Sequence, residues 1–354
     1  MNINKIEGRV MVAPSSERST TPIPATDAAA GLSIVVPLFN EAAGLVPFHA
    51  RLAECTRALG EKRGLKSEIV YVDDGSTDST RVIANQLPAA GTDVQVVSLS
   101  RNFGKEAALL AGLDYARFGA VLFIDGDGQH PPALIDTLVG HWLDDGYDVV
   151  FTAKEHRADE SIGRRLGIKA FYSLINWGTR QKIPEDASDF RLLSPRAAAA
   201  LRQLPERNRF FKGLASWIGF RQKRVDYRPD ERMHGSTSWD LRALTALSVE
   251  ALTSFTIAPL RLASLLGSLL AAGALVFGGW MLVEAVVHER TVPGYYSLII
   301  SVMVIGGVQL LMIGIMGEYL GKILSEIKAR PPYFVAEHSV RDAASAEQSR
   351  TAAE

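Results

Sequence analysis

Apolar residues in the first part of the chain come in short runs that alternate with segments of helical spacing. The runs rich in Val and Ile are residues 32–37, 68–73, 94–99, 121–125 and 148–152, and the clearest helical segment between them is 104–117. Strands that alternate with helices in this way form a mostly parallel sheet covered by helices. The pattern predicts an α/β catalytic domain over residues 31–235.

Two long uncharged stretches lie in the last third of the chain. Residues 262–283 have no charged side chain over 22 positions, and residues 295–317 have none over 23. At 1.5 Å per residue each stretch makes a helix of about 33 Å, enough to cross the hydrocarbon core of a bilayer. The short connection between them predicts a transmembrane hairpin over residues 257–322.

Basic residues mark the outer ends of this hairpin. They are Arg261, Lys322, Lys328 and Arg330, whereas the connecting loop 284–294 has Arg290 and His288 beside two acidic residues. Segments rich in Lys and Arg stay on the cytoplasmic side. We therefore expect a multi-pass protein of the cell inner membrane with a cytoplasmic catalytic domain and a cytoplasmic tail over residues 323–354.

Two further segments have compositions that set them apart from the domain and the hairpin. Residues 236–256 place apolar side chains at helical spacing, which predicts an amphipathic helix lying in the membrane interface. Residues 1–30 mix Ser, Thr, Pro and Ala without an apolar run long enough for a signal peptide, which predicts a disordered tail.

Charge and cysteine content exclude several classes of protein. The formal net charge of -1 gives no general attraction to nucleic acid, so we expect no nucleic-acid partner. Basic residues nevertheless gather between residues 164 and 224, close to the predicted membrane, and indicate contact with anionic lipids and phosphates. The single cysteine, Cys55, cannot form an intrachain disulfide, which agrees with a reducing compartment.

Acidic residues follow three of the predicted strands. Asp125 and Asp127 end one strand within Asp-Gly-Asp-Gly-Gln-His-Pro-Pro, Asp73 ends another, and Glu41 follows the first. In α/β sheets ligands bind at the carboxyl ends of strands. Carboxylates there suit Mg²⁺ or Mn²⁺ bridged to a diphosphate, and they accept hydrogen bonds from a nucleoside. The sequence thus predicts a nucleotide site at one edge of the sheet.

These motifs together resemble family 2 glycosyltransferases over about residues 34–330. The segments that carry the resemblance are Val-Pro-Leu-Phe-Asn-Glu at 36–41, Asp-Asp-Gly-Ser-Thr-Asp at 73–78, Ser-Arg-Asn-Phe-Gly-Lys-Glu at 100–106, the acidic motif at 125–132 and Asp-Phe-Arg-Leu-Leu at 189–193. Within that family the chain is similar to the dolichol-phosphate mannosyltransferase and bactoprenol glucosyltransferase branch. The resemblance implies a GT-A nucleotide-diphospho-sugar domain and suggests a homo-oligomer.

The resemblance also implies a role for particular residues. Donor contacts are implied for Pro37, Glu41, Asp73, Asp74, Lys105 and Asp125, and metal ligation for Asp125, Asp127 and Gln129. Asp189 corresponds to the proposed catalytic base, beside Arg191. Phosphate or acceptor contacts are implied for Arg191, Arg209 and Arg232, because guanidinium groups bind phosphate oxygens in bidentate geometry. Gly126 and Gly128 depart from the usual pattern and are expected to give this loop more backbone freedom.

The function implied is inverting transfer of a hexose from a nucleotide diphosphate sugar, UDP-glucose or similar, to polyprenyl (undecaprenyl) phosphate. One alternative is a processive polysaccharide synthase, but its Gln-x-x-Arg-Trp segment is absent from the sequence. The other alternative is an inactive membrane scaffold, against which the intact acidic motifs argue. We expect Asp189 to position the acceptor and the basic residues around it rather than to act as a base, because an acceptor phosphate with a second pKa of about 6 has little proton to lose near pH 7. A plain structural role at the start of a strand is the alternative, and an asparagine at this position would separate positioning from base catalysis.

Overall fold

The computed structural model describes residues 31–89, 91–154, 187–206, 210–228, 258–288 and 294–341. Its strands are β1 (Gly31–Leu38), β2 (Lys66–Asp73), β3 (Asp93–Leu99), β4 (Ala120–Phe123), β5 (Val149–Lys154), β6 (Ala187–Leu193), β7 (Gln222–Tyr227) and β8 (Val335–Arg341). Its helices are α1 (Leu45–Arg63), α2 (Thr80–Ala84), α3 (Lys105–Tyr115), the 3-10 helix η1 (Pro132–Leu134), α4 (Ile135–Leu143), α6 (Pro195–Gln203), α7 (Phe211–Trp217), α9 (Ala258–His288) and α10 (Tyr295–Ile327).

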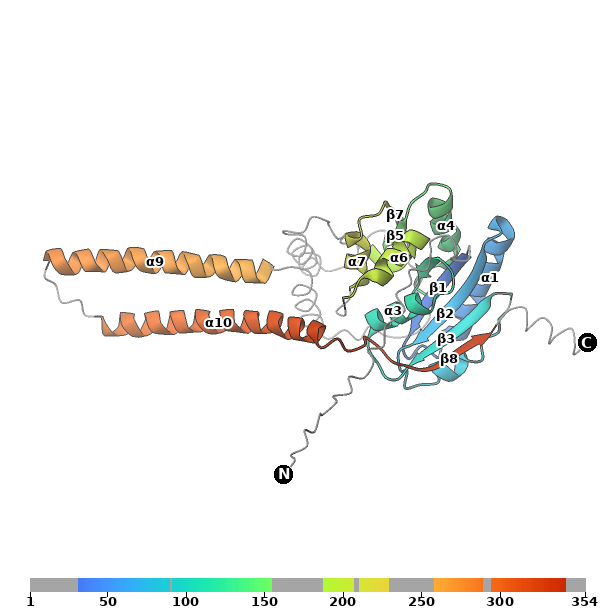
Figure 1. The fold of residues 1–354 in the computed structure, drawn as a ribbon, viewed down its shortest axis with the longest axis horizontal. Coiled ribbons are helices and arrows are strands. Elements are labelled where there is room, and N and C mark those ends of the chain that lie inside the picture. The colour runs from blue at the N-terminus through green and yellow to red at the C-terminus, as the bar shows by residue number, and fades with distance from the viewer. Residues whose placement is uncertain are drawn as a thin grey trace, which may run out of the picture.

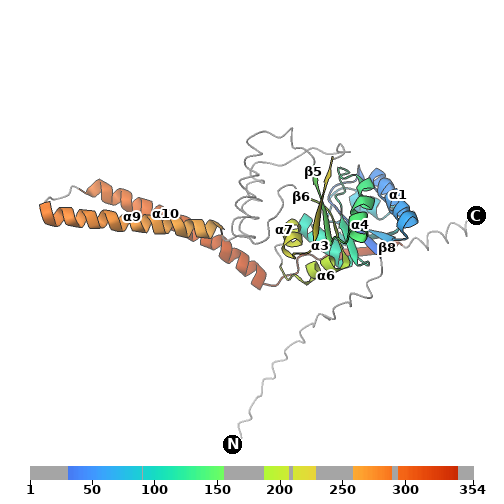
Figure 2. The same ribbon diagram turned by 90° about the horizontal axis from the view of Figure 1, so that it is seen from above.

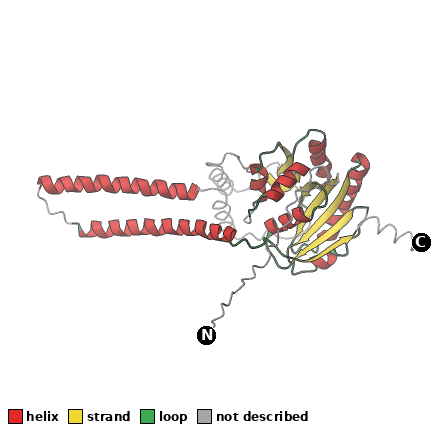
Figure 3. Ribbon diagram, in the orientation of Figure 1, coloured by secondary structure: helices red, strands yellow, loops and turns green. Residues whose placement is uncertain are grey.

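The strands, drawn as yellow arrows in Figure 3, form one sheet. Their order in the sheet is β7-β5-β6-β4-β1-β2-β3-β8. Strand β1 pairs in parallel with β2 and β4, β2 with β3, and β5 with β7. Strand β6 runs antiparallel to both β4 and β5, and β8 runs antiparallel to β3. The five strands predicted from the sequence are present, but β6, β7 and β8 were not anticipated and the sheet is mixed.

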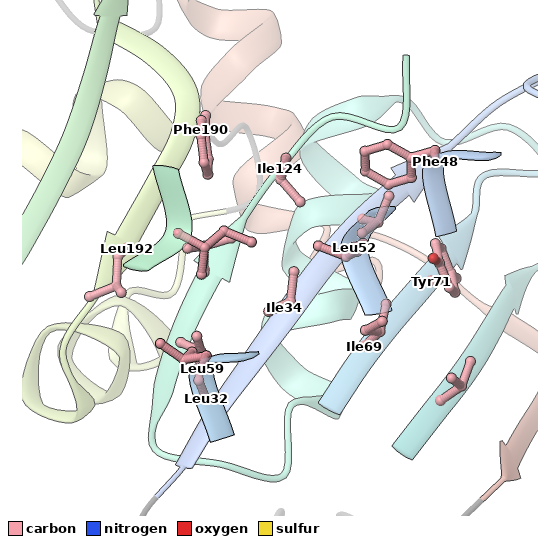
Figure 4. Close-up of a cluster of buried hydrophobic side chains, with 14 of the residues drawn as sticks. Leu32, Ile34, Phe48, Leu52, Leu59, Ile69, Tyr71, Ile124, Phe190 and Leu192 are labelled. Atoms are coloured by element: carbon pink, nitrogen blue, oxygen red, sulfur yellow. The ribbon is translucent and has the colours of Figure 1, made fainter. Parts of the chain in front are cut away.

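Each face of the sheet is covered by its own apolar cluster. Along β1, Leu32 and Ile34 pack with residues of α1, α2 and α4, as Figure 4 shows for part of this cluster. Val35, the residue after Ile34, faces the other side of the sheet in the alternation of a strand and joins the cluster formed with α3, α6 and α7. Burial on both faces explains why the central strands are continuous apolar runs rather than alternating ones.

The long helices α9 and α10 form a hairpin that projects from one side of the α/β domain (Figures 1 and 2). They include the predicted spans and extend beyond them. Large apolar side chains point outward from both helices, and Val276 and Leu310 are 74% and 72% exposed. Among the described residues one helical segment, Val304–Ile327, is long and apolar enough to cross a membrane, and α9 contributes a shorter apolar segment, Gly267–Trp280.

After α10 the chain returns to the α/β domain. Strand β8 pairs with β3 from Val94↔Arg341 to Leu99↔Val335, at the edge of the sheet. Residues 323–354 were predicted to be a tail, so this strand is a new element of the domain. The predicted amphipathic helix at 236–256 and the N-terminal tail at 1–30 lie outside the described residues, and the domain boundaries remain predictions.

Candidate active site

The site lies where the carboxyl ends of β1, β2, β3 and β4 meet. Asn40, after β1, has a φ of 56°, a left-handed conformation that asparagine tolerates. Its Oδ1 accepts a hydrogen bond from the Thr77 N–H at 2.9 Å, and its own N–H donates to Ser76 Oγ at 3.0 Å. These bonds tie the loop after β1, which includes the half-buried Glu41, to the loop after β2.

Asp73 and Asp74 are both buried at the end of β2, with different partners. Asp73 Oδ1 accepts a hydrogen bond from the Ser76 N–H at 3.2 Å. The two Asp74 oxygens accept from the Phe103 and Gly104 N–H groups at 2.7 and 2.9 Å. Burial raises the Asp74 pKa, against these two hydrogen bonds. Although Asp74 was expected to contact the donor, in this structure its carboxylate holds the loop that leads into α3.

Lys105, the first residue of α3, joins two carboxylates from different strands. Its Nζ lies 2.6 Å from Asp125 Oδ1, just after β4, and 2.7 Å from Asp189 Oδ2, near the start of β6. The antiparallel register explains why these acids meet, since Phe123 is paired with Arg191 and two further residues along each strand reach Asp125 and Asp189. The structure therefore brings together three of the residues predicted for the site.

The charges in this cluster hold one another in their ionised forms. Burial disfavours the charge on Lys105, but Asp189 and Asp125 outweigh it and raise the Lys105 pKa. Burial likewise opposes ionisation of Asp125 and Asp189, yet Lys105 holds the pKa of both below the usual range, with His130 acting on Asp125 and Lys212 on Asp189. The site thus presents two carboxylates near neutral pH, bridged by an ammonium group.

The His130 imidazole ring contacts Asp125 on the oxygen that Lys105 does not contact. Its Nε2 lies 3.2 Å from Asp125 Oδ2 and 3.4 Å from Ser188 Oγ, while its Nδ1 lies 2.8 Å from the Tyr227 hydroxyl at the end of β7. The His130 ring is also buried against Phe190 of β6, with 5.2 Å between the ring centroids. The sequence showed this histidine as part of an acidic motif but gave no signal that β6 and β7 would hold it.

Two further charged residues reach Asp189 or its surroundings and were not among the predicted site residues. Lys212 Nζ of α7 lies 3.4 Å from Asp189 Oδ1. Glu106, next to Lys105, accepts a hydrogen bond from the Phe211 N–H at 2.9 Å. Burial, followed by the nearby Asp189 charge, raises the Glu106 pKa to about 7. The sequence places these residues more than a hundred positions apart, so only folding shows that they are neighbours.

Arg191 is buried within the domain and bonded to the backbone. Its Nη2 donates to the Ser188 carbonyl at 3.0 Å and its Nη1 to the Phe211 carbonyl at 3.4 Å. This guanidinium, expected to contact phosphate, here joins β6 to α7. Pro37 lies half-buried in β1, paired with Val72 of β2. Arg209 and Arg232 lie outside the described residues.

The structure shows how Gly126 and Gly128 of the acidic motif fit their surroundings. Gly128 has a φ of 75°, a conformation that other residues rarely adopt. A Cβ on Gly126 would lie 2.8 Å from Leu38 Cδ2. Gly128 thus has a conformational reason to be glycine, and the greater backbone freedom of this loop stays a prediction.

The described residues fit a divalent cation that is shared with a substrate. They contain no group of three or more His, Cys, Asp or Glu side chains suited to enclose a metal. Asp127 is partly exposed, and its Oδ1 accepts a hydrogen bond from the Gln129 N–H at 3.0 Å. Mg²⁺ commonly binds one or two carboxylates together with substrate phosphates. Asp127 matches that donor set, whereas Asp125 has Lys105 and His130 on its two oxygens.

Comparison with known proteins gives consistent matches over most of the chain. Residues 33–201 match the model for Glycosyl transferase family 2. An uncharacterized glycosyltransferase of Synechocystis sp. is 40% identical over 306 residues, which are 86% of this chain and 95% of that protein. The prophage bactoprenol glucosyl transferase homolog of Escherichia coli is 37% identical over 304 residues, which are 86% of this chain and 98% of that protein.

One solved structure among the matches is glucosyl-3-phosphoglycerate synthase from Mycobacterium tuberculosis in complex with Mn²⁺, uridine diphosphate and phosphoglyceric acid. It aligns with a TM-score of 0.44 and 23% sequence identity, over 65% of this chain and 78% of that chain.

Proposed function

The chain belongs to glycosyl transferase family 2, in the polyprenyl-phosphate glycosyltransferase branch, and from this premise we propose that it transfers a hexose from a nucleotide diphosphate sugar to polyprenyl phosphate. UDP-glucose is the proposed donor and undecaprenyl phosphate the proposed acceptor. The observation that carries the proposal is the cluster of Lys105, Asp125 and Asp189, which lies at the carboxyl edge of the sheet in a chain that also forms a long apolar hairpin.

The proposed reaction is one inverting displacement. An oxygen of the acceptor phosphate forms a bond to the anomeric carbon of the hexose, while the bond from that carbon to the diphosphate breaks and its electron pair leaves with the diphosphate. The product is a polyprenyl-monophosphate hexose. Because a phosphate dianion is already a nucleophile, the site has to orient the two substrates and offset their negative charges rather than remove a proton.

Residues of this chain are suited to both tasks. We assign Asp73 and Glu41 to the nucleoside. We assign Lys105 to the donor diphosphate, whose oxygens would bind its ammonium group alongside the Asp125 and Asp189 carboxylates that it contacts. Asp127, with Gln129 and Asp125, would hold Mg²⁺ or Mn²⁺, which stabilises the charge that develops on the leaving diphosphate. His130 keeps the Asp125 side chain in place throughout.

We also propose a membrane arrangement for the reaction. Helices α9 and α10 would both span the inner membrane, and the preceding residues 236–256 would lie in its cytoplasmic interface. The outward-facing apolar side chains of both helices support this arrangement, because they lack protein neighbours that would shield them from water. A polyprenyl chain could then stay in the bilayer while its phosphate reaches the site.

A panel of nucleotide sugars tests the proposal. Purified full-length protein in lipid nanodiscs is mixed with undecaprenyl phosphate, Mg²⁺ and one radiolabelled UDP- or GDP-hexose at a time. Label should pass into the organic phase with one donor and should be released from the lipid by mild acid. Label in a water-soluble polymer would instead favour a processive synthase, and no transfer with any donor would favour an inactive scaffold.

A further inference from the structure

Asp189 lies between two ammonium groups that face different parts of the site. Lys105 contacts Asp189 Oδ2 at 2.7 Å and also contacts Asp125 at 2.6 Å, so it belongs to the side of the metal and the donor. Lys212 contacts the other oxygen, Oδ1, at 3.4 Å. The Asp189 carboxylate therefore separates a donor-side cation from a second cation that the proposed donor site does not use.

Packing fixes the start of α7, the helix that presents Lys212. The neighbouring Phe211 is buried, and its ring meets Phe123 of β4 edge-on at a centroid distance of 5.4 Å. The Phe211 N–H donates to Glu106 at 2.9 Å. The Lys212 side chain is 23% exposed, compared with 63% for the surface residue Lys62. Contacts of Phe211 with β4 and α3 thus fix the start of α7, and with it the backbone position of Lys212.

The positive charge of Lys212 can offset the repulsion between Asp189 and an acceptor phosphate. An acceptor phosphate that approaches Asp189 meets a carboxylate of the same sign, and in a partly buried site such repulsion is strong. A second positive charge, on the other oxygen of Asp189, offsets this repulsion. The 3.4 Å separation is longer than the roughly 2.7–2.9 Å of a strong charge-assisted hydrogen bond, and a lysine stem is flexible. An incoming phosphate can therefore compete with Asp189 for this ammonium group.

We propose that Lys212 is a binding residue for the acceptor phosphate, with Asp189 holding its ammonium group in place until the acceptor arrives. This inference rests on the proposed function, because it takes the second substrate to be a prenyl phosphate. Lys105, on one oxygen of Asp189, then binds the donor diphosphate. Lys212, on the other oxygen, binds the acceptor phosphate.

Steady-state kinetics of full-length variants tests this assignment. Lys212→Met should raise the KM for undecaprenyl phosphate by at least about tenfold, since a hydrogen bond to a charged group is lost. The KM for the nucleotide sugar should stay within about twofold of the wild-type value. Lys212→Arg, which keeps the charge, should recover most of the acceptor affinity. Lys66→Met, which removes an exposed lysine at the start of β2, is the matched control and should behave as wild type.

Equilibrium binding provides a readout that does not depend on turnover. Farnesyl phosphate is titrated calorimetrically into wild-type, Lys212→Met, Lys212→Arg and Lys66→Met protein in nanodiscs, with farnesol as the ligand that lacks phosphate. Binding of farnesyl phosphate should weaken at least about tenfold in Lys212→Met alone. Weak farnesol binding should be equal in all four proteins.

The outcomes separate this inference from the proposed function. A lower kcat in Lys212→Met with unchanged acceptor KM and unchanged farnesyl phosphate binding would overturn the role of Lys212 while leaving the transfer reaction intact. A rise in donor KM alone would place Lys212 on the donor side and overturn it as well. If wild-type protein binds farnesyl phosphate through Lys212 but transfers no hexose, the proposed function fails and the phosphate site stands. If Lys212→Met does not fold, Lys212→Gln and Lys212→Arg give the same comparison.

Discussion

The two aspartates of the acidic motif, Asp125 and Asp127, have different neighbours and therefore differ in their availability to a cation. Asp125 and Asp127 are separated by one glycine, yet Asp125 is bonded to Lys105 and His130 while Asp127 is partly exposed. The two carboxylates of the motif therefore differ in how readily they can take up a cation. Asp127 is the one whose side chain is available without any rearrangement of the cluster.

Asp127→Asn should lower turnover by at least about a hundredfold, because a cation held there stabilises the leaving diphosphate by several kcal/mol. Excess EDTA should abolish transfer by the wild-type protein, and added Mg²⁺ or Mn²⁺ should restore it. Initial rates with radiolabelled donor measure both effects. Asp145→Asn, an exposed acid after α4, serves as the control. Full wild-type activity in excess EDTA would contradict the prediction.

We expect Asp189 to hold cations in place rather than to accept a proton. Although burial favours its neutral form, Lys105 and Lys212 keep its pKa below the usual range, so it stays a carboxylate throughout the range in which the enzyme is assayed. A carboxylate with a lowered pKa is a weak general base. Its position between two lysines instead fits a role in placing cations.

We expect Asp189→Asn to lose most activity at every pH between 6 and 9. The wild-type rate should rise as the acceptor phosphate becomes dianionic around pH 6, and then level off, because Asp189 itself does not titrate in that range. The variant should stay well below the wild-type rate across this range. Rates measured at saturating donor check this. Recovery of the variant toward the wild-type rate at pH 9 would mark Asp189 as a base.

At the scale of elements, the sheet is completed by a strand from the far end of the chain. Strand β8 covers the edge of β3, and its side chains add bonds to the domain. His338 Nε2 lies 2.9 Å from Gln95 Oε1, Ser339 Oγ donates to Asn85 Oδ1 at 2.7 Å, and Arg341 Nη2 donates to the Ala84 carbonyl at 2.9 Å. Phe334, just before the strand, also contacts the loop between β3 and α3, since the Ser100 N–H donates to the Phe334 carbonyl at 2.9 Å.

Removal of β8 should destabilise the α/β domain. A chain that ends after Tyr333 should unfold at least about 5 °C below the full-length protein, because it loses several hydrogen bonds and exposes β3 as an unpaired edge strand. A chain that ends after Arg341 keeps β8 and is the matched control, with the midpoint of the full-length protein. Thermal unfolding followed by intrinsic fluorescence compares them. Equal midpoints for both truncations would show that β8 contributes no stability.

At the scale of the whole molecule, the pairing of β8 with the sheet constrains where the two ends of the helical hairpin can lie. The chain leaves the α/β domain before α9 and rejoins it at β8 after α10 (Figure 1). If both helices span a membrane, the two outer ends of the hairpin must therefore lie on the side that holds the domain. The sheet pairing thus places both outer ends with the domain, and the basic residues carry the expectation that this side is cytoplasmic.

Cysteine labelling tests this topology. In a Cys55→Ser background, a cysteine at Thr291 in the connection between the helices should react with an impermeant maleimide on intact cells. A cysteine at Ser79, which is exposed before α2, should react only after the cells are opened. Labelling is read by a gel shift. Reaction at Ser79 alone on intact cells would reverse the topology, and reaction at neither would show that the connection does not cross.

The sequence by itself predicted the elements that leave a continuous pattern of residues along the chain. The five apolar runs predict strands that are present, and the motifs at their ends correctly identify the glycosyltransferase family, because buried parallel strands and the loops after them leave continuous patterns in the chain. The uncharged stretches likewise predict two long helices that are found, since a helix satisfies its own backbone hydrogen bonds wherever it lies. The GT-A-like α/β fold follows from the same motifs.

Tertiary structure alone decided what depends on pairing between distant segments. The strand character of β6 and β8 comes from neighbours, because an edge or antiparallel strand with polar residues has no strong period of its own. The contacts of Asp189 with Lys105 and Lys212, and the support of Asp125 by His130 and Tyr227, arise only when strand register and helix packing bring those side chains within a few ångströms. Sequence named most of the chemical groups, and folding determined which charges face one another.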